Sequence, residues 1–328
     1  MQGSSVKPQT VDAVVIGRNE GARLRDCLAS LAGQVRRLVY VDSGSTDGSA
    51  DLARGFSAQV VVLDRRQPFT AARARNAGLA QLAADPPQFV QFVDGDCTLD
   101  AGWLAKAVAF LADQPKVVVV CGRRRERFPQ VSVYNRLIDA EWDTPVGEAR
   151  ACGGDALMRF DAVQAAGGYR AGLIAGEEPE MCLRLRRAGG VIWRLEAEMT
   201  LHDAGITSVR QWWQRSRRAG HAFAEGAALH GAGPEAHWVR ETRRALLWGA
   251  VLPLGVATVA VLADPGALWL LVAWPMQVVR LAFRDGAGLH AWQAAFFSVL
   301  GKLPEAQGVL GYHAGQVFRR RAKLIEYK

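Results

Sequence analysis

Residues 89–96 read FVQFVDGD, a short apolar run that ends in two aspartates separated by one glycine. The run from Phe89 to Val93 predicts a buried strand, so Asp94 and Asp96 would stand at its carboxyl end. Open α/β sheets bind ligands in the crevice beyond the carboxyl ends of their parallel strands. Mg²⁺ and Mn²⁺ prefer a few carboxylate oxygens together with phosphate oxygens. The stretch therefore predicts a divalent-metal site facing a phosphorylated ligand, although a lone DGD is also typical of a plain turn.

The flanking sequence alternates apolar runs with segments of helical spacing. Such alternation is typical of βαβ units and predicts an α/β fold with a mostly parallel sheet. Residues 122–150 show no clear pattern. The expected strands are 12–17, 37–41, 59–63, 89–93, 117–121 and 191–194, and the expected helices are 22–31, from about 49, 70–82, 103–112, 160–166, 177–188 and 208–230.

Composition narrows the class of protein. The 328 residues carry a net charge of +8, which suits an anionic partner, and the arginines gathered near the apolar C-terminal third favour lipid over nucleic acid. No zinc-finger spacing or aromatic RNA-binding pattern is present, and no P-loop motif, so a nucleic-acid binder and a P-loop NTPase are excluded.

The cysteines and the N-terminus indicate the compartment. Five scattered cysteines without C-x-x-C spacing indicate a reducing compartment. The polar N-terminus, without an apolar signal segment, predicts a cytoplasmic first domain.

The C-terminal third changes character. Residues 245–263 contain no charge, and residues 267–283 are apolar except for Gln277 and Arg280. A bilayer core of roughly 30 Å needs about 20 helical residues, so the two segments predict a membrane hairpin at about 245–283. Basic residues at both ends predict that both ends face the cytoplasm. The prolines also allow a re-entrant pair, and two buried helices of a soluble domain are the other alternative.

Six short motifs follow one another in a fixed order along residues 11–230. They are VIGRNE (15–20), VDSGSTDG (41–48), RNAG (75–78), FVDGD (92–96), GGY (167–169) and GEEPEMCLRLR (176–186). In this order they resemble the family 2 glycosyltransferases, and the resemblance implies a GT-A fold, an inverting mechanism and a divalent metal, Mn²⁺ or Mg²⁺.

The expected organisation has three parts. They are a flexible N-terminus at 1–10, a GT-A domain at 11–235 and a membrane-associated region at 236–328, in which 290–328 form an amphipathic, interfacial basic tail.

The resemblance also assigns a donor site by position. Many members have a second aspartate where this chain has Ser43, which leaves the donor nucleotide open: UDP is favoured, and GDP and dTDP remain. The implied nucleotide-sugar-binding residues are Arg18, Asn19, Glu20, Asp42, Ser43, Arg75, Asn76, Asp94, Gly95, Gly153, Gly154 and Asp155.

The metal and the base follow from the same resemblance. It implies metal binding by Asp94, Asp96 and His202, with Asp96 the direct ligand. Glu178 stands where the family has its general base, usually an aspartate, and adjacent Glu177 is the alternative base. An inverting transfer needs one carboxylate beside the acceptor hydroxyl to take its proton. Acidic residues at 177–178 are equally typical of a helix N-terminus.

The acceptor site is the least defined. Trp212, Trp213, Arg218 and His221 are the implied acceptor-binding residues, and an amphipathic interfacial helix is the alternative. We expect an inverting transfer from a UDP-sugar to a lipid-linked or glycan acceptor at the cytoplasmic face of the inner membrane, in cell-envelope polysaccharide synthesis. A polyprenyl-phosphate sugar synthase and a non-catalytic nucleotide-binding membrane scaffold remain as alternatives.

Overall fold

The computed structural model describes residues 10–318, which divide into two compact units. The sheet unit holds the residues up to Gln130, Ile138–Leu173 and Glu177–Gly205. The helical unit holds Val131–Leu137, Ile174–Gly176 and the residues from Ile206 on, so that residues 206–235 group with the C-terminal helices. The expected flexible N-terminus, except Thr10, and the basic end of the tail at 319–328 lie outside the described residues.

The sheet unit is built on one nine-stranded sheet in the order β3-β2-β1-β4-β8-β6-β9-β5, with β7 beside β9. β1 pairs in parallel with β2 and β4, whereas β8 runs antiparallel between β4 and β6. This mixed, mostly parallel arrangement confirms the predicted α/β class. The strands are β1 (Val11–Gly17), β2 (Leu38–Asp42), β3 (Gln59–Val62), β4 (Phe89–Asp94), β5 (Cys97–Leu99), β6 (Val117–Glu126), β7 (Gly147–Ala149), β8 (Ala156–Arg159) and β9 (Val191–His202).

Helices cover this sheet because their apolar residues recur on one side. In α1, Leu24, Cys27, Leu28 and Leu31 follow helical spacing and all four are fully buried. α3 begins after Thr70, whose side chain accepts a hydrogen bond from the Arg73 amide and so caps the first turn. The helices are α1 (Ala22–Leu31), α2 (Ser49–Gly55), α3 (Ala71–Leu82), α4 (Trp103–Asp113), α6 (Phe160–Ala165) and α7 (Glu177–Arg187), and α5 (Val133–Glu141) belongs partly to each unit.

The strand order makes the carboxyl ends of β1 and β4 the edge at which open α/β sheets bind ligands in a crevice. The chain leaves β1 towards β2 on one side, and β4 lies on the other, which makes this edge the point where the strand order reverses. Ile16 pairs with Asp94, and the Gly95 amide donates to the Ile16 carbonyl at 2.8 Å. The aspartates that follow β4 therefore lie beside the loop that follows β1.

Two strands are longer than the sequence indicated. β6 continues to Glu126 and β9 to His202, and these two end residues are paired. Four consecutive charged residues, Arg123 to Glu126, form the end of β6, and Glu196 and Glu198 interrupt the extension of β9, so no apolar run marked either extension as a strand. The short β5 also pairs with β9, which sets Cys97 opposite His202. The result is that His202 reaches the same edge of the sheet as the DGD turn.

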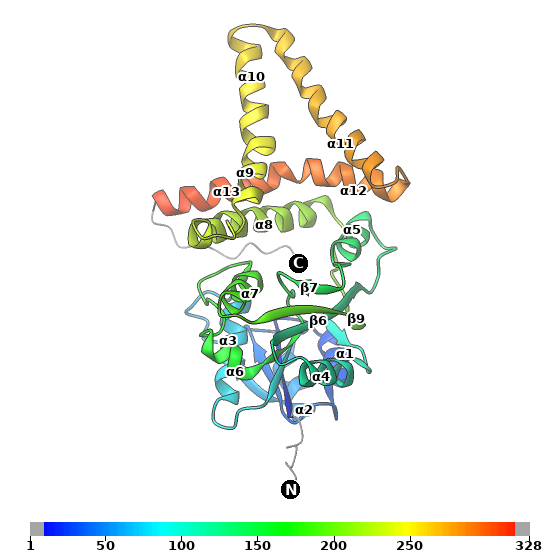
Figure 1. Cartoon of the computed structure of the whole chain (residues 1–328), viewed down its shortest axis with the longest axis vertical. Coiled ribbons are helices and arrows are strands. Elements are labelled where there is room, and N and C mark those ends of the chain that lie inside the picture. Colours follow the sequence, from blue (N-terminus) through cyan, green and yellow to red (C-terminus); the bar gives the residue numbers. More distant parts are fainter. Residues whose placement is uncertain (1–9, 319–328) are drawn as a thin grey trace. The chain divides into compact units, whose positions relative to one another are not determined.

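The helical unit contains a hairpin of apolar helices, whose two legs are labelled α10 and α11 (Figure 1). The segments Val239–Leu262 and Pro265–Arg284 are long and apolar enough to cross a membrane. Only 17% and 6% of their most apolar stretches are buried, unlike interior helices of a soluble domain. The elements are α8 (Val209–His230), α9 (Val239–Leu246), a π-helical turn (Leu247–Val251), α10 (Leu252–Leu262), a 3₁₀ segment (Pro265–Val272), α11 (Ala273–Arg284), α12 (Leu289–Leu300) and α13 (Lys302–Val317).

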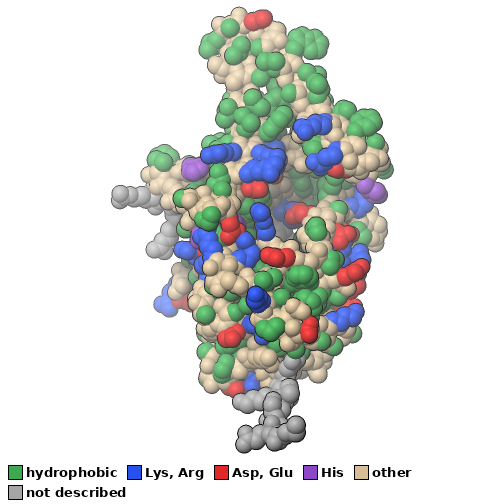
Figure 2. Space-filling model, in the orientation of Figure 1, with side chains coloured by type: hydrophobic (Ala, Val, Ile, Leu, Met, Phe, Trp, Pro, Cys, Tyr) green, Lys and Arg blue, Asp and Glu red, His purple; other side chains and the backbone are tan. Residues whose placement is uncertain are grey.

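The surface of the hairpin matches a hydrocarbon environment. Hydrophobic side chains cover it, and basic side chains gather at its base (Figure 2). Arg243 and Arg244 of α9 are exposed there. Within the hairpin, Val261 and Trp269 are both 82% exposed. Such an apolar surface is costly in water, so this face of the helical unit is suited to lipid.

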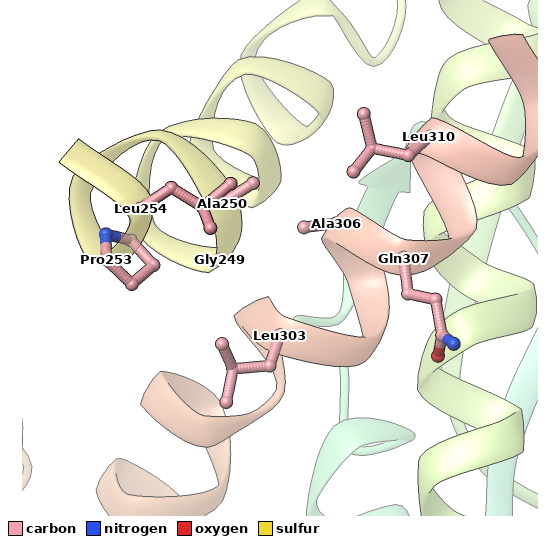
Figure 3. A pocket seen from close by; sticks show the side chains of 8 residues that line it. All are labelled: Gly249, Ala250, Pro253, Leu254, Leu303, Ala306, Gln307 and Leu310. Carbon is pink, nitrogen blue, oxygen red and sulfur yellow. The ribbon is translucent and has the colours of Figure 1, made fainter. Parts of the chain in front are cut away.

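The hairpin is joined to α13 by a close helix crossing. A Cβ atom at Gly249 would lie 1.9 Å from the Lys302 carbonyl oxygen, so only glycine allows the two backbones to approach this closely. Beside the crossing, a shallow apolar groove opens between Leu254 on one side and Leu303 and Leu310 on the other (Figure 3). The crossing therefore fixes the first leg on α13 without filling the space next to it.

The contact between α3 and β1 leads to a stability prediction. A Cβ at Gly78 would lie 2.3 Å from Val14 Cγ1, so Gly78→Ala overpacks the core and should destabilise the protein by about 1–3 kcal/mol. Gly55→Ala in α2 is the control, because a Cβ added there would meet no atom within 4 Å. Urea denaturation measures both. Equal stability of Gly78→Ala and the wild type would show that this helix is not pressed against β1.

Candidate active site

Asp94, at the end of β4, is held between two arginines. Its Oδ1 lies 2.8 Å from Arg75 Nη2, and its Oδ2 lies 3.3 Å from Arg124 Nη2. Burial by itself raises the pKa of Asp94, but the charges of Arg75 and Arg124 outweigh burial and hold this pKa below its ordinary value. Asp94 is therefore a fixed carboxylate with both oxygens engaged by positive charges.

Arg75 connects this carboxylate to the start of α7. Its side chain is 2% exposed, and Nη1 lies 2.7 Å from Glu177 Oε1 and 3.4 Å from Glu178 Oε1. The guanidinium also lies over the ring of Tyr169 at 5.4 Å. Arg75, which the resemblance placed at the donor, thus has its two terminal nitrogens committed to carboxylates inside the protein. It acts here as an internal counter-charge.

Glu178 is a weaker acid than an ordinary glutamate. Burial, followed by the charge of Glu177, raises the pKa of Glu178 to about 7, and Arg75 only partly opposes this. A group that ionises near neutral pH is suited to take a proton during catalysis. Both glutamates also occupy the first turn of α7, where acidic residues are favoured, so the helix-terminus interpretation holds as well.

Asp96 and His202 form a pair that can hold a metal ion. Asp96 Oδ2 lies 3.2 Å from His202 Nε2, and both side chains are buried. Nδ1 of His202 has no hydrogen-bond partner and lies 3.8 Å from Glu126 Oε2. Together with Cys97, their ligand atoms lie within 4.8 Å of one another. Carboxylate oxygen and imidazole nitrogen fit Mn²⁺, so the donor set suits the expected metal.

A second group, Asp94, Cys97 and Asp155, is equally compact but suits a metal less well. Asp155 Oδ1 accepts a hydrogen bond from the Asp94 amide at 2.9 Å, and Oδ2 accepts one from Thr200 Oγ1 at 2.9 Å. Since the oxygens of Asp94 and Asp155 already have partners, they organise the site. Of the three expected metal ligands, the structure pairs Asp96 with His202 and engages Asp94 with arginines.

The loops after β1 and β2 are tied together by their own side chains. The Asn19 amide donates to Ser45 Oγ at 2.9 Å, and the Thr46 amide donates to Asn19 Oδ1 at 2.8 Å. The Gly21 amide donates to Asp47 at 3.0 Å. Asn19, with φ of 57°, therefore shapes the crevice where the resemblance placed the nucleotide.

Other residues expected to bind the nucleotide-sugar also contact nearby groups of this chain. Asp42 accepts hydrogen bonds from the Gly44 and Ser45 amides, and Asn76 exchanges two hydrogen bonds with the backbone of Tyr169. Arg18 lies over the Phe69 ring, Glu20 pairs with Arg23, and the Ser43 amide donates to the Gly17 carbonyl.

The glycines near Asp94 stand where side chains would collide. A Cβ at Gly154 would lie 2.6 Å from Asp94 Oδ2, and one at Gly95 would lie 3.1 Å from the Ile16 carbonyl oxygen. Gly153 adopts a positive φ of 77°, which favours glycine. These residues therefore keep the strand ends open beside the carboxylates.

The expected acceptor residues all lie on α8 in the helical unit. Trp212 is buried against Tyr134 and Phe297, and His221 is buried 3.6 Å from Glu225. Trp213 donates a hydrogen bond to Gln307, and Arg218 is half-buried. The contacts of Trp212 and His221 are those of residues in a helical core.

Sequence reasoning missed two side chains beside the carboxylates, Arg124 and Trp142. The Arg124 guanidinium lies over the Trp142 ring at 4.6 Å, and the ring meets His202 edge-on at 4.8 Å. Both come from the segment 122–150, which carried no periodic signal. The only available hint was the run of three arginines at 123–125.

Comparisons with known proteins find similar glycosyltransferases. The profile of a family described as glycosyl transferase family 2 matches residues 12–167. A pre-mycofactocin glycosyltransferase of Mycobacterium tuberculosis is 27% identical over 231 residues, 67% of this chain and 48% of that protein, so the chain spans about half the length of this relative. The succinoglycan biosynthesis protein ExoA of Rhizobium meliloti is 28% identical over 272 residues, 79% of this chain and 76% of ExoA.

A solved structure extends the likeness to most of the chain. The mannosyltransferase PcManGT of Pyrobaculum calidifontis, in complex with GDP-Man and Mn²⁺, superposes with a TM-score of 0.60 at 20% identity. The match covers 90% of this chain and 88% of the mannosyltransferase. At this identity the likeness concerns the fold, and it confirms the predicted GT-A fold.

The Asp96–His202 pair leads to a metal-binding prediction. Asp96→Asn and His202→Gln should each weaken Mn²⁺ binding about tenfold or more, because each removes one ligand of the pair. Electron paramagnetic resonance of free Mn²⁺ measures the affinity. Asp113→Asn, an exposed acid on α4, is the control and should bind as the wild type does. Unchanged binding by both site variants would place the metal elsewhere.

Proposed function

We propose that this chain, which matches the profile of glycosyl transferase family 2 over residues 12–167, transfers a sugar from a nucleotide-diphosphate sugar to a lipid-linked or glycan acceptor, with Glu178 as general base. The observation that carries the proposal is the cluster at the strand ends, where Arg75 joins Asp94 to Glu178 within 3.4 Å. UDP is the expected nucleotide.

The donor end of the reaction uses the crevice beyond β1 and β4. The loops fixed by Asn19 and Asp42 line it and would receive the nucleoside. Asp96 and His202 would hold the divalent cation beside the diphosphate. When bound, a cation of this kind neutralises the diphosphate and so stabilises it as the leaving group.

The acceptor end uses Glu178. In its ionised form, the carboxylate accepts the proton of the acceptor hydroxyl while that oxygen attacks the sugar, which inverts the configuration at the sugar carbon. Arg75 lies 3.4 Å away and stabilises the ionised form, while burial and Glu177 oppose it. The balance of these effects gives Glu178 a pKa of about 7, so near neutral pH the carboxylate is ionised and still basic enough to take a proton.

The hairpin supports an acceptor that is attached to a membrane. Its apolar legs and the exposed arginines at their base suit insertion from the cytoplasmic side, with the sheet unit left in the cytoplasm. ExoA, similar over 79% of this chain, is a succinoglycan biosynthesis protein. A role in assembling an envelope polysaccharide is consistent with both observations.

The proposal is tested by nucleotide release. UDP-, GDP- and dTDP-sugars are incubated with Mn²⁺ and a membrane-lipid extract, and nucleoside diphosphate is measured. Glu178→Gln should lower turnover by about 10³-fold or more, since it removes the base but keeps the shape. If Glu178→Gln turns over at the wild-type rate, Glu178 is not the general base. If only Glu177→Gln loses turnover, the general base is Glu177.

The pH profile gives an independent check. A base with a pKa of about 7 is protonated in acid, so kcat/KM should fall about tenfold per pH unit below that midpoint and level off above it. Glu177→Gln removes a like charge and should move the midpoint to lower pH, because the ionised form of Glu178 becomes easier to maintain. If the midpoint of the pH profile does not move, the group that titrates in that profile is not Glu178.

Membrane insertion is tested by extraction. Leu254→Arg, on an exposed site at mid-leg, should reduce the fraction that resists alkaline carbonate, because an arginine at the centre of a spanning helix costs about 2.5–3.5 kcal/mol. Leu201→Arg makes the same change at an exposed leucine of β9 and should leave extraction unchanged. Complete release of the wild type by carbonate would exclude insertion.

A further inference from the structure

We propose that Arg124 binds the diphosphate of the donor, a role that rests on the proposed transferase function. Arg124 is the middle member of three consecutive arginines on β6 that have different surroundings. Arg123 is buried and pairs with Asp139 at 3.1 Å, and Arg125 is exposed and pairs with Glu198 at 2.7 Å. Arg124 alone of the three reaches the carboxylate cluster at the strand ends.

The guanidinium of Arg124 is held by long contacts only. Nη2 lies 3.3 Å from Asp94 Oδ2 and 3.4 Å from Cys97 Sγ, and Nε lies 3.5 Å from Asp155 Oδ2. Nε is buried but makes no hydrogen bond. Charge-assisted hydrogen bonds are usually about 2.7–2.9 Å long, so Arg124 has donors that its present neighbours do not satisfy.

Arg75, in the same cluster, also has a buried Nε without a hydrogen bond, but its terminal nitrogens are held more tightly. Its two terminal nitrogens contact Glu177 and Asp94 at 2.7 and 2.8 Å, so moving it to a ligand would break two short ion pairs. Arg124 would give up only contacts of 3.3 Å or longer. Of the two arginines on Asp94, Arg124 is therefore the one that can change partner at low cost.

Trp142 packs against Arg124 beside the metal-binding candidates. The guanidinium lies over the indole ring at 4.6 Å, a cation–π contact that favours keeping the charge at this position. The same ring meets His202 edge-on at 4.8 Å, and His202 lies 3.2 Å from Asp96. Arg124 thus lies next to the pair that would hold the cation, which is where the two phosphates of a donor belong.

Charge gives the reason for an arginine here. Three carboxylates, Asp94, Asp96 and Asp155, surround this end of the site and repel a diphosphate. A divalent cation offsets part of this repulsion, and a guanidinium adds a further positive charge with two parallel donors that match phosphate oxygens. Binding of the diphosphate replaces the long contacts of Arg124 with short ones to phosphate oxygens.

The test measures binding and not turnover. Calorimetry with Mn²⁺ present compares UDP with UMP, GDP with GMP, and inorganic pyrophosphate alone. Arg124→Gln should weaken binding of the diphosphates and of pyrophosphate about 10- to 100-fold, with a smaller change for the monophosphates. Arg124→Lys retains the buried charge without the fork and should lose part of the affinity. Arg125→Gln, the matched control, should bind as the wild type does.

The outcomes separate this role from the proposed function. Wild-type diphosphate affinity in a folded Arg124→Gln or Arg124→Lys protein would overturn the role of Arg124 and leave the transferase proposal intact. Equal losses for UDP and UMP would also overturn it, because the second phosphate would then not be the group recognised. If the wild type binds none of the three diphosphate probes, the proposed function fails and this role fails with it.

Discussion

The site depends on one buried arginine, Arg75. Arg75, 2% exposed, holds Asp94 at the end of β4 and Glu177 at the start of α7, so it joins the side of the cluster that carries Asp96 and His202 to the side that carries Glu178. Removing one partner of a buried ion pair costs about 3–5 kcal/mol, because the remaining charge is left without compensation. The position of α7 relative to the sheet is therefore fixed by electrostatics as well as by packing.

The rest of the sheet unit positions the residues around Arg75. The reversal of strand order at β1 creates the crevice, and the side chains of Asn19 and Asp42 shape its walls by binding backbone amides. The extension of β9 carries His202 to Asp96 from a distant part of the chain. Backbone geometry thus places the polar groups, and burial, together with the charges of Glu177 and Arg75, then sets the pKa of Glu178.

Sequence reasoning found the parts of the site that follow apolar runs. The apolar run at 89–93 predicted the position of Asp94 and Asp96, and the family resemblance indicated Glu178. It could not assign partners: Arg75 and Asn76 were expected at the donor, but their polar atoms contact Asp94, Glu177 and the backbone of Tyr169. Arg124 was missed because neighbouring charges obscured the strand period of β6, and Trp142 was missed because it follows α5 in a stretch without a clear pattern. Only contacts between distant parts of the chain bring the two residues to the cluster. The motifs for the base, the metal and the acceptor remain predictions until they are measured.

The ion pair between Arg75 and Glu177 joins residues 102 positions apart in the chain. During synthesis, the segment that contains the first four strands leaves the ribosome long before α7, and His202 follows later still. A nascent chain that has folded its first βαβ units holds an arginine and aspartates without their final partners. The cluster of charges at the strand ends is incomplete at that stage, because Glu177 and His202 are not yet present. The proposed donor site is therefore assembled late in translation, when the apolar C-terminal helices are about to emerge.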